Sequence, residues 1–223
     1  MIELSRSTLA SMIDHTLLAP EATIEQVERL CDQARQLAVA SVCVTSAMVA
    51  TACARLTGTI PVCTVIGFPS GAFRGRVKAE EARVAQVDGA TEFDVVVNLG
   101  LAKSARFTDL RRDLERVRNA VPRPLVLKVI VESAALTVEE LRSTAKAALD
   151  AGADFLKTST GFHPAGGATV EAVRELRAIA GDSLGVKASG GIRTLATAQA
   201  MIDAGATRLG MSATAAVLAD CPG

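Results

Sequence analysis

The sequence predicts an α/β protein built as a single (β/α)8 barrel. Short β-type runs alternate with helical stretches along all 223 residues, and no Pro- or Ser-rich linker divides them. An Asp-Gly-Ala or Asp-Ala-Gly-Ala turn recurs before strands, at residues 88–90, 150–153 and 203–206. The chain length falls within the range of one such barrel. We therefore expect residues 1–223 to form one barrel domain with a short amino-terminal helical extension.

Eight runs have the apolar, β-branched composition of buried parallel strands. In order they are Ile13–Leu17, Ala40–Val44, Val62–Ile66, Glu92–Val97, Leu125–Val131, Asp154–Thr158, Gly185–Ser189 and Thr207–Met211. Helical stretches lie between them at Thr23–Leu37, Arg74–Val87, Asp109–Asn119, Val138–Asp150, Val170–Ala180 and Leu195–Asp203. An open doubly wound sheet is the alternative. Residues 14–20, after the first strand, lack the Gly-x-Gly-x-x-Gly turn typical of that fold.

Local signals mark several helix ends. Thr23 and Gln26 match the Ser/Thr-x-x-Glu/Gln capping pattern of a helix start. Thr137 and Glu140 repeat that pattern. Glycines after a helix favour the left-handed conformation that ends it, and they stand here at positions 89, 152 and 205.

The composition argues against several classes of protein. Lys and Arg together number 24, equal to Asp and Glu, and Trp and Tyr are absent, which disfavours a nucleic-acid-binding surface. The five cysteines form no Cys-x-x-Cys pair and only two histidines are present. Neither a metal site nor a disulfide framework is therefore expected. Unpaired cysteines are typical of a reducing compartment, so we expect a cytoplasmic protein.

One stretch has the length of a membrane-helix candidate. Leu37–Ala54 contains no charged residue, but polar side chains interrupt it, and Thr45 or Ser46 would cap a helix start. We expect a buried strand followed by an amphipathic helix here, not a membrane span. The amino-terminal segment also lacks the long apolar run of a signal peptide.

Three successive expected strands each contain a lysine. These residues are Lys128, Lys157 and Lys187, and Asp94 lies in the strand before them. Taking either kind of charge out of water is costly unless a partner compensates it. Each lies near a Gly-, Ser- or Thr-rich turn, and barrel sites lie where strands end and loops begin. We therefore expect an active site at that end of the barrel.

Two lysines on adjacent strands suit imine chemistry. Burial lowers the pKa of a lysine ammonium and frees the neutral amine, and a neighbouring ammonium lowers that pKa further. Strand periodicity puts Phe155, Lys157 and Ser159 on one face, and Lys187 lies on the next strand. A lone strand lysine usually extends its ammonium to solvent, but three on adjacent strands favour a functional site.

Two roles suit Asp94. It can form a structural ion pair with Lys128 or Lys187, because a buried lysine needs a counter-charge. It can also move protons through a water molecule. The two roles are compatible, and the sequence leaves both open.

Three small-residue turns follow the last expected strands, at Thr158–Gly161, Ser189–Gly191 and Gly210–Ser212. Loops at this end of a barrel that lead into helices present backbone N–H groups to phosphate. Arg193 and a helix starting near Thr194 would add positive potential. Each turn alone is a weak signal, but together they predict a phosphate-binding site.

The remaining candidate side chains favour structural roles. A histidine on a first strand, such as His15, is more often a hydrogen-bonded structural residue than a catalytic one. Cys43 lies mid-strand and suits a small core position. The loop with His163 and Pro164 offers no partner for a ligand.

Six segments form a further pattern. They are Ile13–Leu18, Val62–Pro69, Glu92–Asn98, Leu127–Ile130, Ala151–Gly161 and Gly185–Arg193. On these motifs the chain resembles the deoxyribose-phosphate aldolase family of class I aldolases over nearly its full length. The last two segments in combination are highly specific for that family.

The resemblance implies reversible cleavage of 2-deoxy-D-ribose 5-phosphate into D-glyceraldehyde 3-phosphate and acetaldehyde, with no metal or other cofactor. Lys157 falls on the family's Schiff-base lysine, Lys187 on the second lysine that assists it, and Asp94 on the acidic proton relay. The other implied residues are Asp14, Thr16 and Lys128 for substrate binding, and Gly161, Gly190, Gly191 and Ser212 for phosphate binding.

The chain departs from the family pattern at three places near the expected site. Ala19 stands where many members carry lysine or asparagine, which removes one polar group. The loop from Gly161 to Gly167 reads Gly-Phe-His-Pro-Ala-Gly-Gly, one residue longer than the common version. Ala213 follows Ser212 where paired serines are common. These changes bear on phosphate affinity and substrate preference, and they leave the imine chemistry in place.

Two other functions are compatible with the sequence. One is a class I aldolase that acts on another short phosphorylated sugar. The other is a barrel that binds a sugar phosphate without turnover, or that serves as a scaffold. In each case we expect a homodimer or homotetramer that binds small molecules and neither nucleic acid nor membranes.

Overall fold

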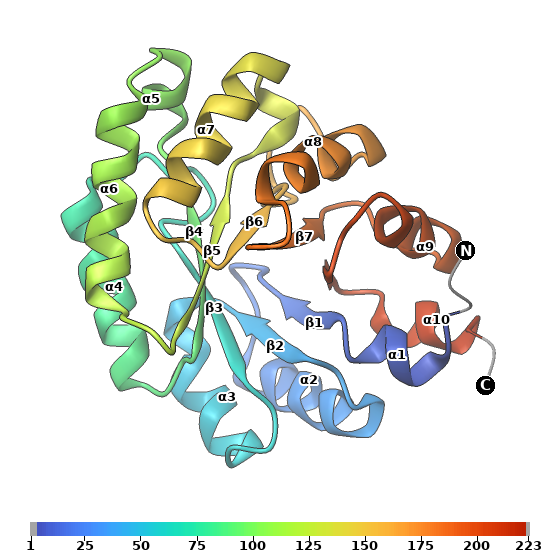
Figure 1. Ribbon diagram of the computed structural model, residues 1–223. Coiled ribbons are helices and arrows are strands. Elements are labelled where there is room, and N and C mark those ends of the chain that lie inside the picture. Colours follow the sequence, from blue (N-terminus) through green and yellow to red (C-terminus); the bar gives the residue numbers. More distant parts are fainter. Residues whose placement is uncertain (1–3, 222–223) are drawn as a thin grey trace.

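The computed structural model describes residues 4–221, which fold as a closed barrel of parallel strands inside a ring of helices (Figure 1). The strands are β1 (Ile13–Leu17), β2 (Ser41–Val44), β3 (Val62–Ile66), β4 (Glu92–Val96), β5 (Val126–Ile130), β6 (Phe155–Lys157), β7 (Gly185–Ser189) and β8 (Arg208–Met211). Each strand pairs with the next, and β8 pairs with β1 to close the barrel. The predicted (β/α)8 architecture is confirmed.

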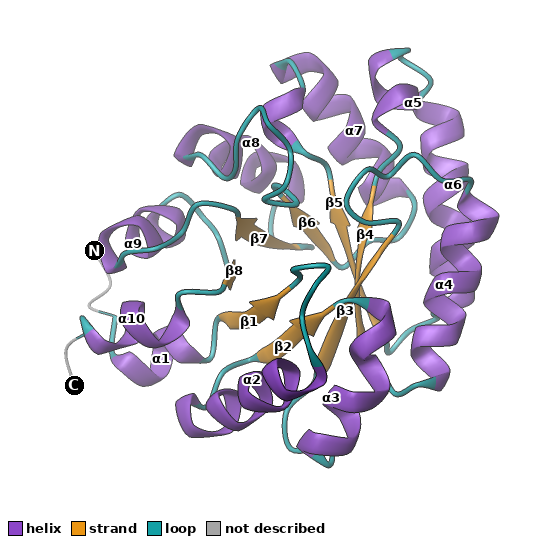
Figure 2. Ribbon diagram, turned by 180° about the vertical axis from the view of Figure 1, so that it is seen from behind, coloured by secondary structure: helices purple, strands orange, loops and turns teal. Residues whose placement is uncertain are grey.

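Helices surround the strands on all sides of the barrel (Figure 2). They are α1 (Arg6–Ala10), α2 (Ile24–Leu37), α3 (Val49–Leu56), α4 (Gly75–Val87), α5 (Leu99–Lys103), α6 (Phe107–Ala120), α7 (Val138–Asp150), α8 (Val170–Ala180), α9 (Leu195–Asp203) and α10 (Thr214–Ala219). Two short 3-10 turns, η1 (Ser46–Met48) and η2 (Ser133–Ala135), complete the set. Helix α1 is the expected amino-terminal extension, and Ser5 caps it by accepting a hydrogen bond from the Thr8 N–H.

The predicted signals at helix ends are largely confirmed. Both capping pairs form complete capping boxes, at the starts of α2 and α7. The glycines at 89, 152 and 205 all have positive φ, at +107°, +85° and +111°. They let the chain turn sharply from a helix into the next strand.

The helix cap expected after β2 is wrong. Thr45 makes no side-chain cap, because the turn η1 separates it from the start of α3. Ser46 instead donates its hydroxyl hydrogen to Glu81 Oε1 at 2.9 Å. The uncharged stretch still folds as a strand followed by a helix, and no helix within residues 4–221 is long and apolar enough to cross a membrane.

Two helices have no counterpart in the sequence prediction. Helix α5 starts directly after β4, where the Asn98 side chain accepts a hydrogen bond from the Leu101 N–H at 3.3 Å. Helix α10 follows β8. They contain five and six residues, which is too short to display a helical repeat of apolar positions.

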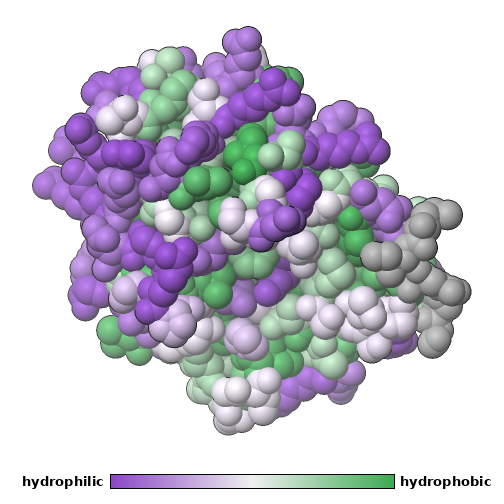
Figure 3. Space-filling model, viewed as in Figure 1, coloured by the Kyte–Doolittle hydropathy of each residue, from purple (hydrophilic) through white to green (hydrophobic). Residues whose placement is uncertain are grey.

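The longer helices turn an apolar stripe toward the strands. In α2 the buried residues are Val27, Leu30, Cys31 and Ala34, which follow the i, i+3, i+4, i+7 spacing of one helix face. Hydrophilic side chains cover the opposite sides, and they gather over α4 to α7 on the face seen in Figure 3. The helices thus shield the barrel from water.

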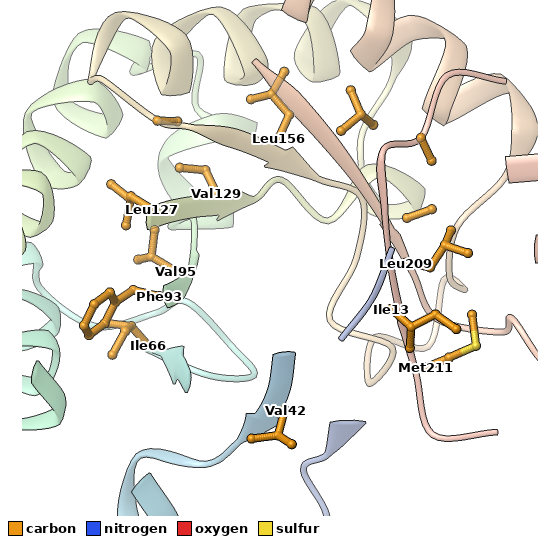
Figure 4. Packing of buried hydrophobic residues seen from close by; sticks show 14 of the residues in the cluster. Ile13, Val42, Ile66, Phe93, Val95, Leu127, Val129, Leu156, Leu209 and Met211 are labelled. Atoms are coloured by element: carbon orange, nitrogen blue, oxygen red, sulfur yellow. The ribbon is translucent and has the colours of Figure 1, made fainter. Parts of the chain in front are cut away.

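Each strand presents two different faces, because successive strand residues point in opposite directions. Side chains that point outward form an apolar layer against the helices, called here the outer layer. Among its fully buried members are Phe93, Val95, Leu127, Val129 and Leu156 (Figure 4). The inward-facing residues include charged groups that are buried just as completely, and these form the charged interior.

Candidate active site

The predicted lysines and aspartate lie inside the barrel at neighbouring positions. In the parallel register, Lys157 on β6 is the direct partner of Lys187 on β7. Asp94 on β4 is the direct partner of Lys128 on β5. Lys157 is 3% exposed, and the other three side chains are fully buried. The strand alternation therefore brings all four groups to one place.

Asp94 contacts all three lysines. Lys157 Nζ donates a hydrogen bond to Asp94 Oδ2 at 2.7 Å, and Lys187 Nζ donates to the same oxygen at 2.6 Å. Lys128 Nζ donates to the other oxygen, Oδ1, at 2.9 Å. The structural ion pair that the sequence left open is thus present with both partners. The carboxylate also lies next to Lys157, where it can exchange a proton through water.

Asp14 on β1 is the second buried carboxylate of the site. Its Oδ2 accepts a hydrogen bond from Lys187, and its Oδ1 accepts from Ser41 Oγ at 2.7 Å and from Arg208 Nη1 at 2.6 Å. Thr16, two residues further along β1, donates its hydroxyl hydrogen to the Asp14 carbonyl at 2.7 Å. These contacts fix the position of the first strand relative to the lysines.

Mutual pairing determines the charge of these groups. Burial alone would raise the pKa of Asp94 and of Asp14, but the adjacent lysines hold both pKa values below the ordinary range. Burial alone would lower the pKa of Lys187, but Asp14 and Asp94 raise it above its ordinary value. The pKa of Lys128 is raised against burial in the same way, mainly by Asp94. Lys187 therefore stays protonated, because it is paired with both Asp14 and Asp94. The sequence analysis did not predict that both carboxylates would contact it.

A cavity of about 470 Å³ opens at the carboxyl ends of the strands. Residues from the end of β1 and from the loops after β6, β7 and β8 line it, including Thr16, Ser189 and Arg193. Lys157 is the one lysine among the described residues that line this cavity. Lys128 and Lys187 are occupied with carboxylates deeper in the barrel. Of the three lysines, Lys157 is therefore the one placed to meet a ligand.

The predicted glycine turns form one side of the cavity. Gly161, Gly190 and Gly191 have φ values of +81°, +90° and +84°, and Ser212 lies on the turn after β8. A Cβ on Gly190 would approach the Cα atoms of Gly167 and Gly161 to 3.0 and 3.2 Å, so a side chain has no room there. Gly191 faces open space. Glycine thus lets the β6 and β7 loops approach each other beside the cavity.

The positions that depart from the family pattern lie at this cavity or next to its lining residues in the chain. Ala19 is among its lining residues. Ala213 precedes α10 and provides no side-chain cap. In the longer loop, His163 Nδ1 accepts a hydrogen bond from the Ala165 N–H at 3.2 Å, which stabilises the turn itself. Each departure therefore changes the surroundings of the cavity and not the lysines beneath it.

Two serines each follow a buried lysine by two residues, Ser159 after Lys157 and Ser189 after Lys187. Ser159 Oγ and Ser189 Oγ are buried, and neither has a hydrogen-bond partner within residues 4–221. Ser189 also lines the cavity. Buried hydroxyls are normally satisfied, so these two are suited to bind a ligand or water.

Sequence reasoning missed two charged residues of the interior, Glu92 and Arg208. Glu92 lies two residues before Asp94 and shares its inward face, and Glu92 Oε2 is 2.6 Å from Lys128 Nζ. Arg208 is the first residue of β8, and its Nη1 is 2.6 Å from Asp14 Oδ1. Both stand an even number of positions from a predicted site residue, so strand alternation was the signal that could have found them.

Glu132, directly after β5, was also missed. Its φ is +58° and its side chain is 1% exposed. Thr160 Oγ1 donates a hydrogen bond to Glu132 Oε2 at 2.6 Å, and the Thr160 N–H donates to Oε1 at 3.2 Å. Glu132 therefore anchors the loop that carries Gly161.

His15 has the structural role that the sequence favoured. Its Nδ1 lies 2.8 Å from Thr214 Oγ1 on α10, and its Nε2 lies 3.3 Å from Gln33 Oε1 on α2. Cys43 is buried and packs with Cys63 in a small apolar cluster, as expected of a core cysteine. Neither residue is free to act on a ligand in the cavity.

Two groups of side chains are close enough together to share a metal ion. One contains Cys43, Cys63 and Asp94, and the other contains Asp14, Cys63 and Glu92. Every carboxylate in them is already paired with a lysine or an arginine. A cation would have to displace those positive groups, so the surroundings do not favour a metal.

The geometry defines a class of site. A lysine at the base of a cavity, beside a carboxylate and a second lysine, is the arrangement that activates an amine to form an imine with a carbonyl substrate. Its place at the carboxyl ends of the strands is where barrel enzymes carry their chemistry. The fold and site together define an imine-forming barrel enzyme.

Comparison with known proteins narrows this class. The chain belongs to the DeoC/LacD family of aldolases, which it matches over residues 8–219. It is 54% identical over 215 residues to the deoxyribose-phosphate aldolase of Kocuria rhizophila, covering 96% of this chain and 97% of the relative. It is 52% identical over 214 residues to the enzyme of that name from Corynebacterium diphtheriae, with the same coverage of 96% and 97%.

Solved structures agree with this assignment. The aldolase QR15 superposes with a TM-score of 0.90 at 38% identity, covering 99% of this chain and 96% of that one. The deoxyribose phosphate aldolase of Aeropyrum pernix, described as a unique tetramer, gives a TM-score of 0.89 at 35% identity and covers 97% of this chain and 92% of its own. The barrel and its loops are thus shared along almost the whole chain.

Proposed function

We propose that this chain is a class I aldolase that reversibly cleaves 2-deoxy-D-ribose 5-phosphate into D-glyceraldehyde 3-phosphate and acetaldehyde. The observation that carries the proposal is the position of Lys157, at the base of a cavity and 2.7 Å from Asp94. Family membership supplies the substrate, because the relatives that are 54% and 52% identical are deoxyribose-phosphate aldolases.

The first steps form the imine. The neutral amine of Lys157 adds to the C1 carbonyl of the open-chain sugar, and loss of water gives an iminium ion. This cation accepts the electron pair of the C2–C3 bond when that bond breaks, so the protein supplies the electron sink itself. Lys187, held as an ammonium by two carboxylates, keeps a positive charge next to the reacting amine.

The next steps move two protons. Asp94, through a water molecule, takes the proton of the C3 hydroxyl as the C2–C3 bond breaks, while Lys187 remains an ammonium beside it, and glyceraldehyde 3-phosphate leaves. The remaining enamine is then protonated at C2. Hydrolysis of the resulting imine releases acetaldehyde and returns Lys157 as the amine. Asp94 suits this role because it contacts both Lys157 and Lys187 through one oxygen.

We propose that the phosphate binds at the glycine turns. Gly161, Gly190, Gly191 and Ser212 line the same cavity as Lys157, and Arg193 contributes a positive charge to it. Backbone N–H groups at such turns are well suited to phosphate oxygens. Thr16 lines the cavity near Lys157 and is placed to contact substrate hydroxyl groups. Asp14 and Lys128 bond to other charged groups beneath it, so we assign them an indirect part in substrate binding.

We also propose that residues 1–223 form one aldolase domain, that the protein assembles as a homodimer or homotetramer, and that it works in the cytoplasm. The tetrameric relative from Aeropyrum pernix supports the assembly. The five cysteines are all free thiols in this structure, as expected in a reducing compartment.

Reductive trapping tests the function. The protein is incubated with deoxyribose 5-phosphate or acetaldehyde in the presence of borohydride, digested, and analysed by peptide mass spectrometry. We expect a reduced adduct on Lys157 that is absent from the Lys157→Ala variant. Lys146→Ala, a change of an exposed lysine, is the matched control and should trap as the unmodified protein does. A folded protein that binds the sugar but yields no lysine adduct would show that the barrel binds without imine chemistry.

A further inference from the structure

Six charged groups inside the barrel, five of them buried and Arg208 partly buried, form a closed ring in which the sign alternates at every step. In order, the ring runs through Arg208, Asp14, Lys187, Asp94, Lys128 and Glu92, and back to Arg208. Each member therefore has two neighbours of opposite charge. Three members are positive and three are negative, so the ring is neutral as a whole.

The links at the amino-terminal ends of the strands close the ring. Arg208 Nη1 lies 2.6 Å from Asp14 Oδ1 and 3.4 Å from Glu92 Oε2. Glu92 Oε2 lies 2.6 Å from Lys128 Nζ. The remaining links join Asp94 to Lys128 and to Lys187, and Asp14 to Lys187. A direct contact of 3.6 Å between Lys128 Nζ and Asp14 Oδ2 crosses the ring.

Lys157 stands outside this ring. It contacts the ring at one atom, Asp94 Oδ2, which Lys187 also contacts. Because the ring is neutral without it, an ammonium at Lys157 gives the buried cluster a net charge of one. A net charge in a desolvated interior is unfavourable. Loss of the Lys157 proton makes the whole cluster neutral.

We propose that Glu92 and Arg208 are positioning residues that complete the ring and so make Lys157 the group that gives up its proton. The inference rests on the proposed function, since it explains how the nucleophile of that reaction is kept as a neutral amine. Glu92 and Arg208 are the first residues of β4 and β8, at the opposite strand ends from the cavity. Their effect on Lys157 therefore passes through the ring and not through the substrate.

The pKa values of Arg208, Asp14, Lys187, Asp94 and Lys128 are all shifted toward the charged form of each group. Burial alone would lower the pKa of Arg208, but Asp14 and Glu92 raise it above its ordinary value. The same balance holds the other lysines of the ring as ammonium groups and its two aspartates as carboxylates. Lys157 is the positive group that the ring does not need for neutrality.

Other titratable groups also lie near Lys157 and the ring, and the hydrogen bond with Cys63 lowers the pKa of the Cys43 thiol among them. Cys63 donates a hydrogen bond to Asp94 Oδ1 at 3.2 Å, as a neutral thiol does, and Cys43 packs beside it. At the cavity rim, Glu21 and Arg193 have opposite charges. Glu132 is bound by Thr160 and by no member of the ring.

The test measures imine formation as a function of pH. Acetaldehyde and cyanoborohydride trap the imine, and intact mass spectrometry gives the pH at which trapping is half maximal. Glu92→Gln removes a negative charge and should move this midpoint to lower pH. Arg208→Gln removes a positive charge and should move it to higher pH. We expect shifts of about one pH unit, the effect of a unit charge roughly 10 Å away at an effective dielectric constant of about 20.

Two further variants separate charge from structure. Arg208→Lys keeps the charge and should leave the midpoint near that of the unmodified protein. The double variant Glu92→Gln/Arg208→Gln restores neutrality and should return the midpoint toward that value. A purely structural role predicts weaker trapping in both single variants with no opposed shifts. Thermal unfolding of each variant shows whether it is folded.

Opposed shifts support the inference, and shifts in the same direction, or none, overturn it. If one of the two single variants does not fold, the other still tests the inference. Its trapping midpoint must shift in the predicted direction, to lower pH for Glu92→Gln or to higher pH for Arg208→Gln. If the unmodified protein traps no imine at any pH, the proposed function fails instead. The two failures are therefore distinguishable.

Discussion

The outer layer and the charged interior lie on opposite faces of the same strands, one residue apart. Leu156 is fully buried against the helices, and Lys157, the next residue, is almost as fully buried inside the barrel. In the outer layer, burial removes apolar surface from water and stabilises the fold. In the interior, burial carries a desolvation cost that mutual pairing must offset. Equal burial thus serves stability on one face and chemistry on the other.

The largest expected effect is a loss of activity from a change in the charged interior, with no loss of the stability that the outer layer provides. Lys157→Met removes the proposed nucleophile, so we expect kcat to fall by at least about 10³-fold. The melting temperature should be unchanged or higher, because the variant leaves a neutral set of buried charges. A coupled assay of deoxyribose 5-phosphate cleavage and a thermal scan measure the two effects.

Lys78 on α4 is the matched control for that variant. It is a fully buried lysine outside the interior, where its Nζ donates a hydrogen bond to the Val96 carbonyl at 2.8 Å and lies 3.4 Å from Asp113. Lys78→Met should lower stability and leave imine trapping intact in the folded protein. If folded Lys78→Met lost imine trapping, or if Lys157→Met had a lower melting temperature, stability and chemistry would not be separate functions of the two regions.

The reverse experiment breaks the outer layer. Leu156→Ala leaves a cavity between β6 and the helices and should lower the free energy of unfolding by about 2–5 kcal/mol. Imine trapping at a temperature well below the melting point should persist, since Lys157 keeps its contact with Asp94. Urea unfolding gives the first quantity and cyanoborohydride trapping the second. An inactive but fully stable Leu156→Ala protein would show that the two faces are not separable.

The pH dependence of stability should report the charged interior and one histidine outside it, His15. Asp14 and Asp94 have lowered pKa values, so their contribution is present above about pH 4 and is lost as the pH falls further. Lys128 and Lys187 have raised pKa values, so theirs is present below about pH 10 and is lost as the pH rises further.

Stability measured by urea unfolding should therefore be nearly constant from about pH 7 to about pH 9 and fall on both sides. The first loss, below about pH 6.5, should come from His15, whose pKa is lowered by burial. The Leu156→Ala protein should give a parallel curve displaced downward, because its lost contacts carry no charge. A change in the shape of that curve, and not only in its height, would mean that outer-layer packing helps to set the interior charges.

The smallest expected effect lies at the proposed phosphate turn, outside both regions. Ala213→Ser restores the second hydroxyl of the paired serines and adds one neutral donor, worth about 0.5–1.5 kcal/mol. KM for deoxyribose 5-phosphate should fall by about two- to tenfold, since 1.4 kcal/mol is tenfold. The rate with unphosphorylated deoxyribose should not change. An equal effect on both sugars would place residue 213 away from the phosphate.

The sequence predicted the barrel well because its signals are local and repeated. Five strands differ from their predicted ranges by one residue at one end or both, and three match fully, since runs such as Val62–Ile66 are bounded by clear turn residues. The capping boxes at Thr23 and Thr137 fixed two helix starts. The turn η1 escaped prediction because it depends on Ser46 reaching Glu81, a contact 35 positions away in the chain.

The sequence predicted most of the buried charged groups that lie together inside the barrel, but not how they are connected. Strand position made the buried lysines and Asp94 conspicuous, yet nothing local indicates that Asp14 binds a lysine 173 positions away or that Arg208 binds Asp14 across 194 positions. Those contacts exist because closing the barrel puts β1 beside β8, with β7 next to it. Glu92 was overlooked although it shares a face with Asp94, because a charge at a strand end is usually solvated.

The seam between β1 and β8 has a consequence for the making of this protein. On the ribosome β1 is synthesised early. Its partner β8 is synthesised only after nearly all of the remaining chain. Thr16 and Ser212 can therefore share a cavity, and Arg208 can reach Asp14, only after β8 has been translated and has docked. No shorter nascent chain carries the finished pocket. A chain should therefore gain aldolase activity only after β8 has been translated.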